Sequence, residues 1–159
     1  KVVGGELIVE INKSMTSDKE ISINIEMPSL QGLTLRGGVQ AYVSGVDAKS
    51  FKLNASDGIS ADISGKFENL DAVLNGGCSI KLKGSAAVAT INGGGGTSLN
   101  AKHFTIDTAK VEADGGATLD LGAVKNLDAV ANGGASINYT GDPQIIRGNA
   151  DISGSIHKY

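Results

Sequence analysis

The sequence is poor in the residues that most folds use to build a wide core or a reactive site. Its 159 residues include no tryptophan, 4% aromatic residues, two prolines and a single cysteine. One cysteine cannot form an internal disulfide, so the chain is not a disulfide-stapled scaffold. No apolar run approaches the roughly twenty residues that a membrane-spanning helix needs. The scarcity of large rings instead favours a narrow core filled by Ala, Val, Ile and Leu.

The charges are few and mixed, and this excludes one class of partner. Lysine and arginine number 14 and the acidic residues 17, so the net charge is −3 at pH 7. A nucleic-acid-binding surface needs a basic stripe, so we expect no nucleic-acid partner. The chain starts at Lys1, and its opening stretch KVVGGELIVEI lacks the layout of a signal peptide. We therefore expect a mature or trimmed fragment that forms one domain over residues 1–159.

Glycine marks a repeat with a step of about nineteen residues. The windows Gly65–Gly84 and Gly122–Gly141 are identical at 12 of 20 positions, at an offset of 57 residues, or three steps. A period of this length is typical of a stacked repeat in which each unit contacts its neighbours. The step glycines often follow Asn, Asp or Ser, which tolerate the left-handed backbone of a sharp corner. The corner glycines are Gly38, Gly58, Gly77, Gly96, Gly116, Gly134 and Gly154.

Each corner is followed by a short segment in which apolar and polar residues alternate, as in Cys78–Lys83 (CSIKLK). Period two with one apolar face predicts a half-buried strand. Leucine is too sparse for a leucine-rich repeat, and no helical period is sustained. The sequence therefore predicts an all-β fold, a single parallel β-helix of six or seven turns stacked about 4.8 Å apart. The predicted interior residues are Ile59, Ile63, Cys78, Ile80, Leu82, Leu99, Leu119, Leu121, Ile137 and Tyr139.

The two ends of the chain differ from the repeats. Leu7–Ile11 and Ile21–Met27 are predicted strands, with the polar segment Asn12–Glu20 between them. Residues 1–27 are expected to form N-terminal strands that cap the open end of the rod, and residues 28–159 to form the repeated turns. The final strands are predicted near Ile145 and Ile152.

Stacking at this step aligns the outward residues of successive turns in rows. One row of short polar side chains is the candidate binding face, because a flat row of hydroxyls suits a polysaccharide or an ordered surface. The alternative is a plain solvated strand surface, since Ser and Thr also suit exposed β positions. The candidate binding face consists of Gln40, Ser60, Ser79, Ser98, Thr118 and Ser136. A neighbouring row of mixed charge, interpreted as solvated, consists of Tyr42, Asp62, Lys81, Asn100, Asp120 and Asn138.

Many β-helices are polysaccharide lyases or glycosidases, so paired carboxylates matter. Glycoside hydrolysis needs two carboxylates about 5 to 9.5 Å apart. Asp62 and Asp120 fall three turns apart in one row, which is about 14 Å at the strand spacing. Asp71 and Asp128, from the repeated Asn-Leu-Asp-Ala-Val, are also three turns apart. We therefore predict no catalytic residues and no enzyme, and keep a carbohydrate-active β-helix enzyme, lyase or glycosidase-like, as the alternative.

Metal and cofactor sites have equally little support. His103 and His157 are isolated, with no partner at ligand spacing, and both are predicted to be exposed. Gly93–Gly96 is similar to the start of a calcium-binding nonapeptide, but Ser98 occupies the position of its aspartate. Cys78 takes an inward position and is predicted to be a small core residue. We expect no metal and no cofactor.

Two stretches and one repeated motif resemble a known family. The segments Met27–Gly38 (MPSLQGLTLRGG) and Gly133–Ile146 (GGASINYTGDPQII), and the repeated Gly-Gly-x-Ser-Ile, are similar to the auto-transporter adhesin, head GIN domain family. The most specific part is the element formed by Tyr139, Gly141 and Pro143 within the second segment. The resemblance implies a parallel β-helix in a bacterial protein that is secreted or attached to the cell envelope. It also implies a non-catalytic adhesin that presents a repetitive polar face to a glycan or a surface protein.

Overall fold

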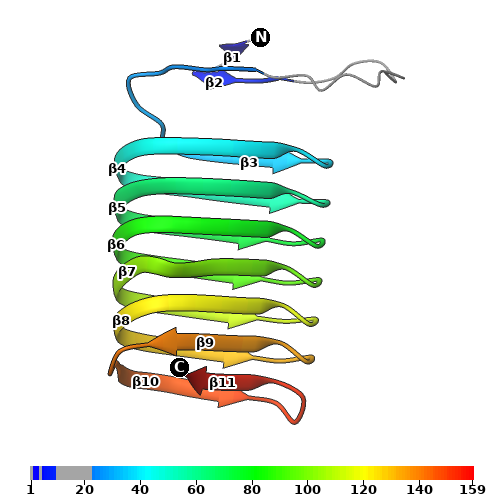
Figure 1. The fold of residues 1–159 in the computed structure, drawn as a ribbon, viewed down its shortest axis with the longest axis vertical. Helices are drawn as coiled ribbons and strands as arrows, with labels where there is room; N and C mark the ends of the chain where they lie inside the picture. Colours follow the sequence, from blue (N-terminus) through cyan, green and yellow to red (C-terminus); the bar gives the residue numbers. More distant parts are fainter. Residues whose placement is uncertain (1, 4, 10–22) are drawn as a thin grey trace.

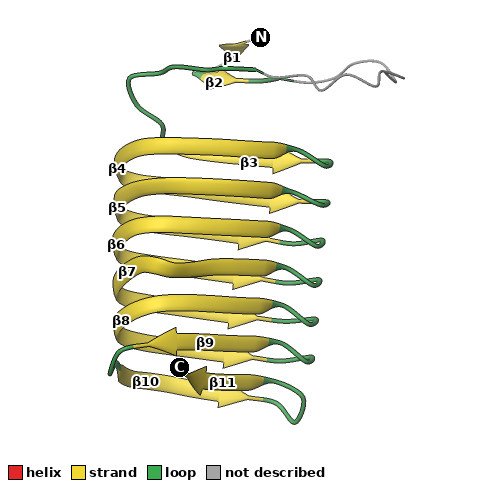
Figure 2. Ribbon diagram, in the orientation of Figure 1, coloured by secondary structure: helices red, strands yellow, loops and turns green. Residues whose placement is uncertain are grey.

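A computed structural model of the chain describes residues 2–3, 5–9 and 23–159. Within these residues every regular element is a strand and no helix occurs, as Figure 2 shows. The strands stack in parallel as a β-solenoid of about seven turns (Figure 1). The predicted parallel β-helix with a step of about nineteen residues is confirmed.

Each central turn is one long strand that bends once, so that its two halves lie in two facing layers (Figure 1). We call the halves that follow the tight corners the first layer (40–44, 60–64, 79–83, 98–102, 118–121, 136–140 and 155–158), and the halves that lead into the corners the second layer. All neighbouring strands of the solenoid pair in parallel. The solenoid strands are β3 (Gly32–Arg36), β4 (Gln40–Ser56), β5 (Ser60–Leu74), β6 (Ser79–Gly93), β7 (Ser98–Ala113), β8 (Thr118–Ala131), β9 (Ser136–Thr140), β10 (Gln144–Ala150) and β11 (Ser155–Lys158).

Six of the tight corners are two-residue turns with left-handed backbone at both central positions. Gly133 and Gly134 have φ of 59° and 79°, and the turn is closed by Ala135 N donating to the Asn132 carbonyl at 3.1 Å. Two positive φ values favour glycine strongly, as in the tight turns that connect hairpin strands. Asp57 is the non-glycine residue with positive φ, at 66°, in the described part of the chain. Six of the seven predicted corner glycines therefore lie in such turns. Gly154 does not have a positive φ, and its corner is held instead by the Asp151 carboxylate, which accepts from the Gly154 amide at 2.7 Å.

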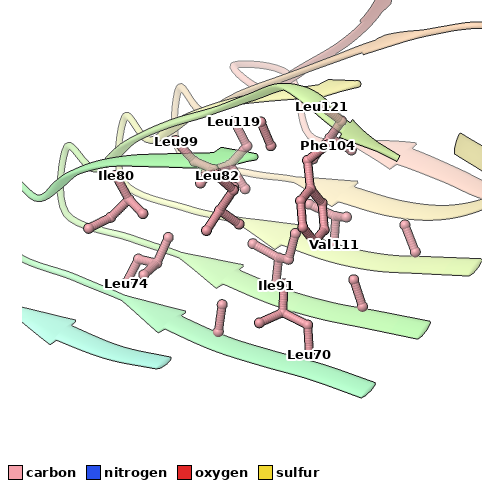
Figure 3. Packing of buried hydrophobic residues seen from close by; sticks show 14 of the residues in the cluster. Leu70, Leu74, Ile80, Leu82, Ile91, Leu99, Phe104, Val111, Leu119 and Leu121 are labelled. Carbon is pink, nitrogen blue, oxygen red and sulfur yellow. The ribbon is translucent and has the colours of Figure 1, made fainter. Parts of the chain in front are cut away.

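The interior between the layers is a narrow tube of small and branched apolar side chains (Figure 3). Nine of the ten predicted interior residues are buried, and Tyr139 is half-buried. Tyr139 is less covered because the next turn contributes only the four-residue strand β11 beside it. The three phenylalanines of the chain line up along the tube. The Phe51 and Phe67 rings stack at 4.9 Å between centroids, and Phe104 follows at 6.1 Å.

The inward position after each corner can hold a polar side-chain atom if a backbone carbonyl of the corner accepts a hydrogen bond from it. Cys78 is buried as predicted, and its Sγ donates to the Asn75 carbonyl at 2.9 Å. One turn later Thr97 occupies the same column with 1% exposure. Its hydroxyl donates to the Gly94 carbonyl at 2.7 Å, so burial leaves no unsatisfied donor.

The predictions for the chain ends are right only in part. The final strands exist as predicted, since β10 contains Ile145 and β11 begins at Ser155, close to Ile152. Ile152 itself lies in a bend with its side chain fully exposed, because the Asp151 carboxylate accepts from the Ser153 and Gly154 amides and folds this segment into a turn. Near the N-terminus, β2 (Glu6–Leu7) pairs with β1 (Val2–Val3) in antiparallel fashion. Residues 8–9 and 23–27 form no strand in the described structure. The rest of the predicted strands and the polar segment between them lie outside the described residues.

Candidate functional site

The outer face of the first layer carries both predicted polar rows. The two rows are separated by inward residues that fill the tube, such as Ile80, Leu99 and Leu119. The strand pairing aligns all six residues of the candidate binding face and adds Ser155 at the C-terminal end. The same register aligns the mixed-charge row and adds His157. The ladders inferred from the repeat step therefore exist in the fold.

The two rows together form a shallow depression over the N-terminal half of this face, with a volume of about 290 Å³. Four of the six predicted face residues line it, and Thr118 and Ser136 lie on the same row beyond its edge. Four residues of the mixed-charge row complete the lining, although the sequence interpretation had assigned that row to solvent. Residues two apart in a strand point to the same face, so this spacing could have predicted that the two rows form one surface. We call this depression the hollow; its polar lining is Gln40, Tyr42, Ser60, Asp62, Ser79, Lys81, Ser98 and Asn100.

Several polar groups of the hollow have no partner. The hydroxyls of Ser60, Ser79 and Ser98 form no hydrogen bond, and the Lys81 ammonium forms no ion pair, within the described part of the chain. Asp62 differs, because its carboxylate meets the Lys83 ammonium at 3.2 Å. These groups are exposed on adjacent turns, and exposed donors and acceptors without a protein partner are able to bind a ligand.

The C-terminal half of the same face is occupied by its own network. Asp120 accepts hydrogen bonds from the Tyr159 hydroxyl at 2.6 Å and from Asn138 Nδ2 at 2.8 Å. The Lys102 ammonium lies 3.3 Å from the other carboxylate oxygen and 4.4 Å from the centroid of the Tyr159 ring. Because these groups satisfy one another, this half of the face offers far less to a ligand than the hollow.

The network also changes how Asp120 titrates. Partial burial disfavours the charged form and is the largest single influence. The hydrogen bonds from Tyr159, Asn138 and Lys102 outweigh it together, so the pKa of Asp120 lies below its ordinary value of 3.8. A lowered pKa in the folded state means that the ionised carboxylate stabilises the fold above the unfolded-state pKa. That contribution is lost as the pH falls through the folded-state pKa.

Asp120→Asn should therefore reduce the free energy of unfolding at pH 7 by about 1 kcal/mol, the scale of a hydrogen bond to a partly exposed charged group. The difference from the parent should shrink as the pH falls through the lowered folded-state pKa, because the carboxylate then becomes protonated in the folded state as well. Urea denaturation at pH 7 and at a series of acidic pH values measures this. Asp114→Asn is the charge-matched control, since the Asp114 carboxylate makes no hydrogen bond or ion pair in the described chain. An equal loss in both variants would contradict the role of the network.

The residues considered for catalysis and metal binding are dispersed. Asp62 and Asp120 are separated by three strand pairings, as are Asp71 and Asp128. His103 and His157 are exposed, as predicted. Among the described residues, no group of three or more His, Cys, Asp or Glu side chains converges to hold a metal ion. The glycine run Gly93–Gly96, whose likeness to a calcium-binding nonapeptide found little support in the sequence, leads into one of the tight corners, at Gly95 and Gly96.

The described chain contains no helix that is long and apolar enough to cross a membrane.

Comparison with known proteins gives one match. A search of curated proteins and a search of solved structures found no match. The family described as "Putative auto-transporter adhesin, head GIN domain" matches residues 1–143, which include the hollow and the Asp120 carboxylate. By this match, which spans most of its length, the chain belongs to the auto-transporter adhesin, head GIN domain family.

Proposed function

We propose that this protein is a non-catalytic bacterial protein of the cell surface or envelope, and that it binds a glycan or a protein partner through the hollow. The observation that carries the proposal is the set of unpartnered polar groups on three adjacent turns of one shallow face. The family description, which names an adhesin, supports a surface location and a binding role.

The shape of the hollow favours binding over turnover. Its lining includes one carboxylate, that of Asp62, and this group is already paired with Lys83. Acid–base hydrolysis of a glycoside needs a second carboxylate across the scissile bond. The nearest acidic residue in the same row is Asp120, about 14 Å away at the strand spacing. A long, repetitive and open surface instead suits many weak contacts, which several copies on one cell can add together.

Substitutions at two serines test the face. Ser79→Ala removes one hydroxyl of several and should change the affinity less than about threefold, whereas Ser79→Trp combined with Ser98→Trp should fill the hollow and abolish binding. Binding of the purified protein to an array of glycans and immobilised matrix proteins measures both effects. Both serines are exposed on strands, so the fold should survive, and circular dichroism checks this.

The control for bulk is the same pair of changes on the second layer, Thr90→Trp with Lys110→Trp, at two paired positions. Binding that persists in the Ser79/Ser98 variant would contradict the proposal. Shortening of any polysaccharide by the purified parent protein, lost on mutation of a single carboxylate, would favour the enzyme instead.

A further inference from the structure

We infer that the hollow binds a linear acidic glycan that lies along the solenoid axis, with a sugar carboxylate at the Lys81 ammonium. This inference rests on the proposed function and specifies its ligand. It follows from three features of the hollow: an uncompensated positive charge, a regular row of free hydroxyls and an exposed ring at one end.

The charge comes from two lysines on one strand. Lys81 and Lys83 both lie on the outer face of β6, two residues apart. The Asp62 carboxylate, on the neighbouring strand, lies 3.2 Å from the Lys83 ammonium, which leaves Lys81 without an ion pair in the described structure. Lys83 itself lies outside the lining of the hollow, so the surplus of one positive charge belongs to the group formed by Asp62, Lys81 and Lys83. Because Lys83 engages the Asp62 carboxylate, the Lys81 ammonium in the hollow is the unpaired charge of this group, in a protein whose net charge is −3. A ligand carboxylate would supply the missing partner and form a charge-assisted hydrogen bond.

The hydroxyls set the direction of the ligand. Ser60, Ser79 and Ser98 are paired directly in the register of β5, β6 and β7. Neighbouring hydroxyls are thus about 4.8 Å apart along the axis, and the row spans about 10 Å. A serine hydroxyl both donates and accepts, as does a sugar hydroxyl, so the two match without a fixed polarity. An extended sugar chain parallel to the axis can meet one serine at each turn.

The ends of the hollow limit the length of the bound segment. Tyr42, with 77% of its surface exposed, stands at the N-terminal end, and its hydroxyl accepts a hydrogen bond from Gln40 Nε2 at 2.9 Å. The flat ring offers an apolar face on which the C–H side of a sugar can stack. The contacts among Lys102, Asp120 and Tyr159 begin beyond Asn100 at the other end. An acidic peptide fits less well, because the apolar residues of the lining offer little surface to anchor a side chain: Ala41 is small, and Ala61 and Ile80 are buried.

Calorimetric titration with galacturonate hexamers tests the inference at low and at physiological salt. We expect binding that weakens as salt rises, with little binding of a neutral glucose hexamer or of hexaglutamate. Lys81→Gln should weaken binding of the galacturonate hexamer about tenfold or more. Lys52→Gln is the matched control, since Lys52 is also exposed and without an ion pair in the described chain, but lies on the second layer. It removes the same charge and should leave the affinity unchanged.

The possible outcomes separate this inference from the proposed function. If a ligand is blocked by Ser79→Trp with Ser98→Trp but binds Lys81→Gln as tightly as the parent, the hollow is a binding site and its preference for acid is refuted. Equal affinity for the neutral hexamer or for hexaglutamate also overturns the inference. If the galacturonate hexamer binds and the tryptophan pair does not weaken it, both the inference and the proposed use of the hollow fail.

Discussion

Replacing Gly84 with alanine should destabilise the solenoid by at least about 3 kcal/mol, because the substitution combines backbone strain with a steric overlap. Gly84 lies where β6 bends between the layers and has a φ of 118°. A Cβ atom built there would overlap the carbonyl oxygen of Gly65 in the turn before. Since that oxygen belongs to the backbone of the paired strand, it cannot move aside without breaking the pairing. Urea denaturation followed by circular dichroism measures the loss.

Gly77→Ala is the matched control for this prediction. Gly77 also has a positive φ, 73°, but nothing lies within 4 Å of the Cβ that the substitution would add. Its cost should be limited to the left-handed backbone, about 1–2 kcal/mol. If the two variants unfold at the same urea concentration, the prediction is wrong, because Gly84 is then not required for the close approach of neighbouring turns at the bend.

Leu119→Ala should cost about 2–5 kcal/mol, the usual range for a buried leucine. Leu119 has no exposed surface and sits in register between Leu99 and Ile137 in the first layer. Its side chain crosses the tube, since a Cβ added to Gly93 in the second layer would lie 2.8 Å from Leu119 Cδ2. Truncation would leave a cavity that two rigid strand layers cannot close.

Val88→Ala serves as the surface control, because Val88 is 45% exposed and its truncation opens no enclosed cavity. It should cost less than about 1 kcal/mol. Thermal unfolding of the two variants, followed in parallel, gives the comparison. A melting temperature of Leu119→Ala equal to that of the parent would contradict the inward register of β8.

The fold was predictable because one signal determines several of its levels. A glycine at each step, as at Gly134, sets both the corner and the offset between turns, and the offset sets the register. Period two then decides which side of each strand is buried, as at Ile80 and Leu82. The burial of Thr97 was not predicted, because it depends on a hydrogen bond from its hydroxyl to the Gly94 carbonyl and not on apolar character.

The candidate site was predictable only in part. The repeat step aligns Ser60 with Ser79, but the extent of the hollow depends on contacts that the step does not encode. The Tyr159 hydroxyl donates a hydrogen bond to Asp120, which lies 39 residues earlier in the sequence. This contact occupies polar groups in the C-terminal half of the face that a ligand would otherwise bind. The Lys81 ammonium is likewise free because the Asp62 carboxylate, the single carboxylate of the hollow, pairs with Lys83 instead. Which side chains pair on the outer face depends on their length and on the competing partners nearby. The alternation of polar and apolar residues along the sequence does not determine it.

The windows Gly65–Gly84 and Gly122–Gly141 are identical at 12 of 20 positions although they lie three turns apart, so nearly the same segment can occupy different turns of the solenoid. Most contacts join a turn to the turn directly before or after it. A duplication or loss of one whole step therefore leaves every corner and every inward column with a suitable neighbour. Copying a segment such as the one that carries Ser79 would lengthen the polar row by one hydroxyl and carry a second copy of Lys81 with it. Affinity for a long polymer could then evolve in increments of one turn, by gene slippage rather than by point mutation.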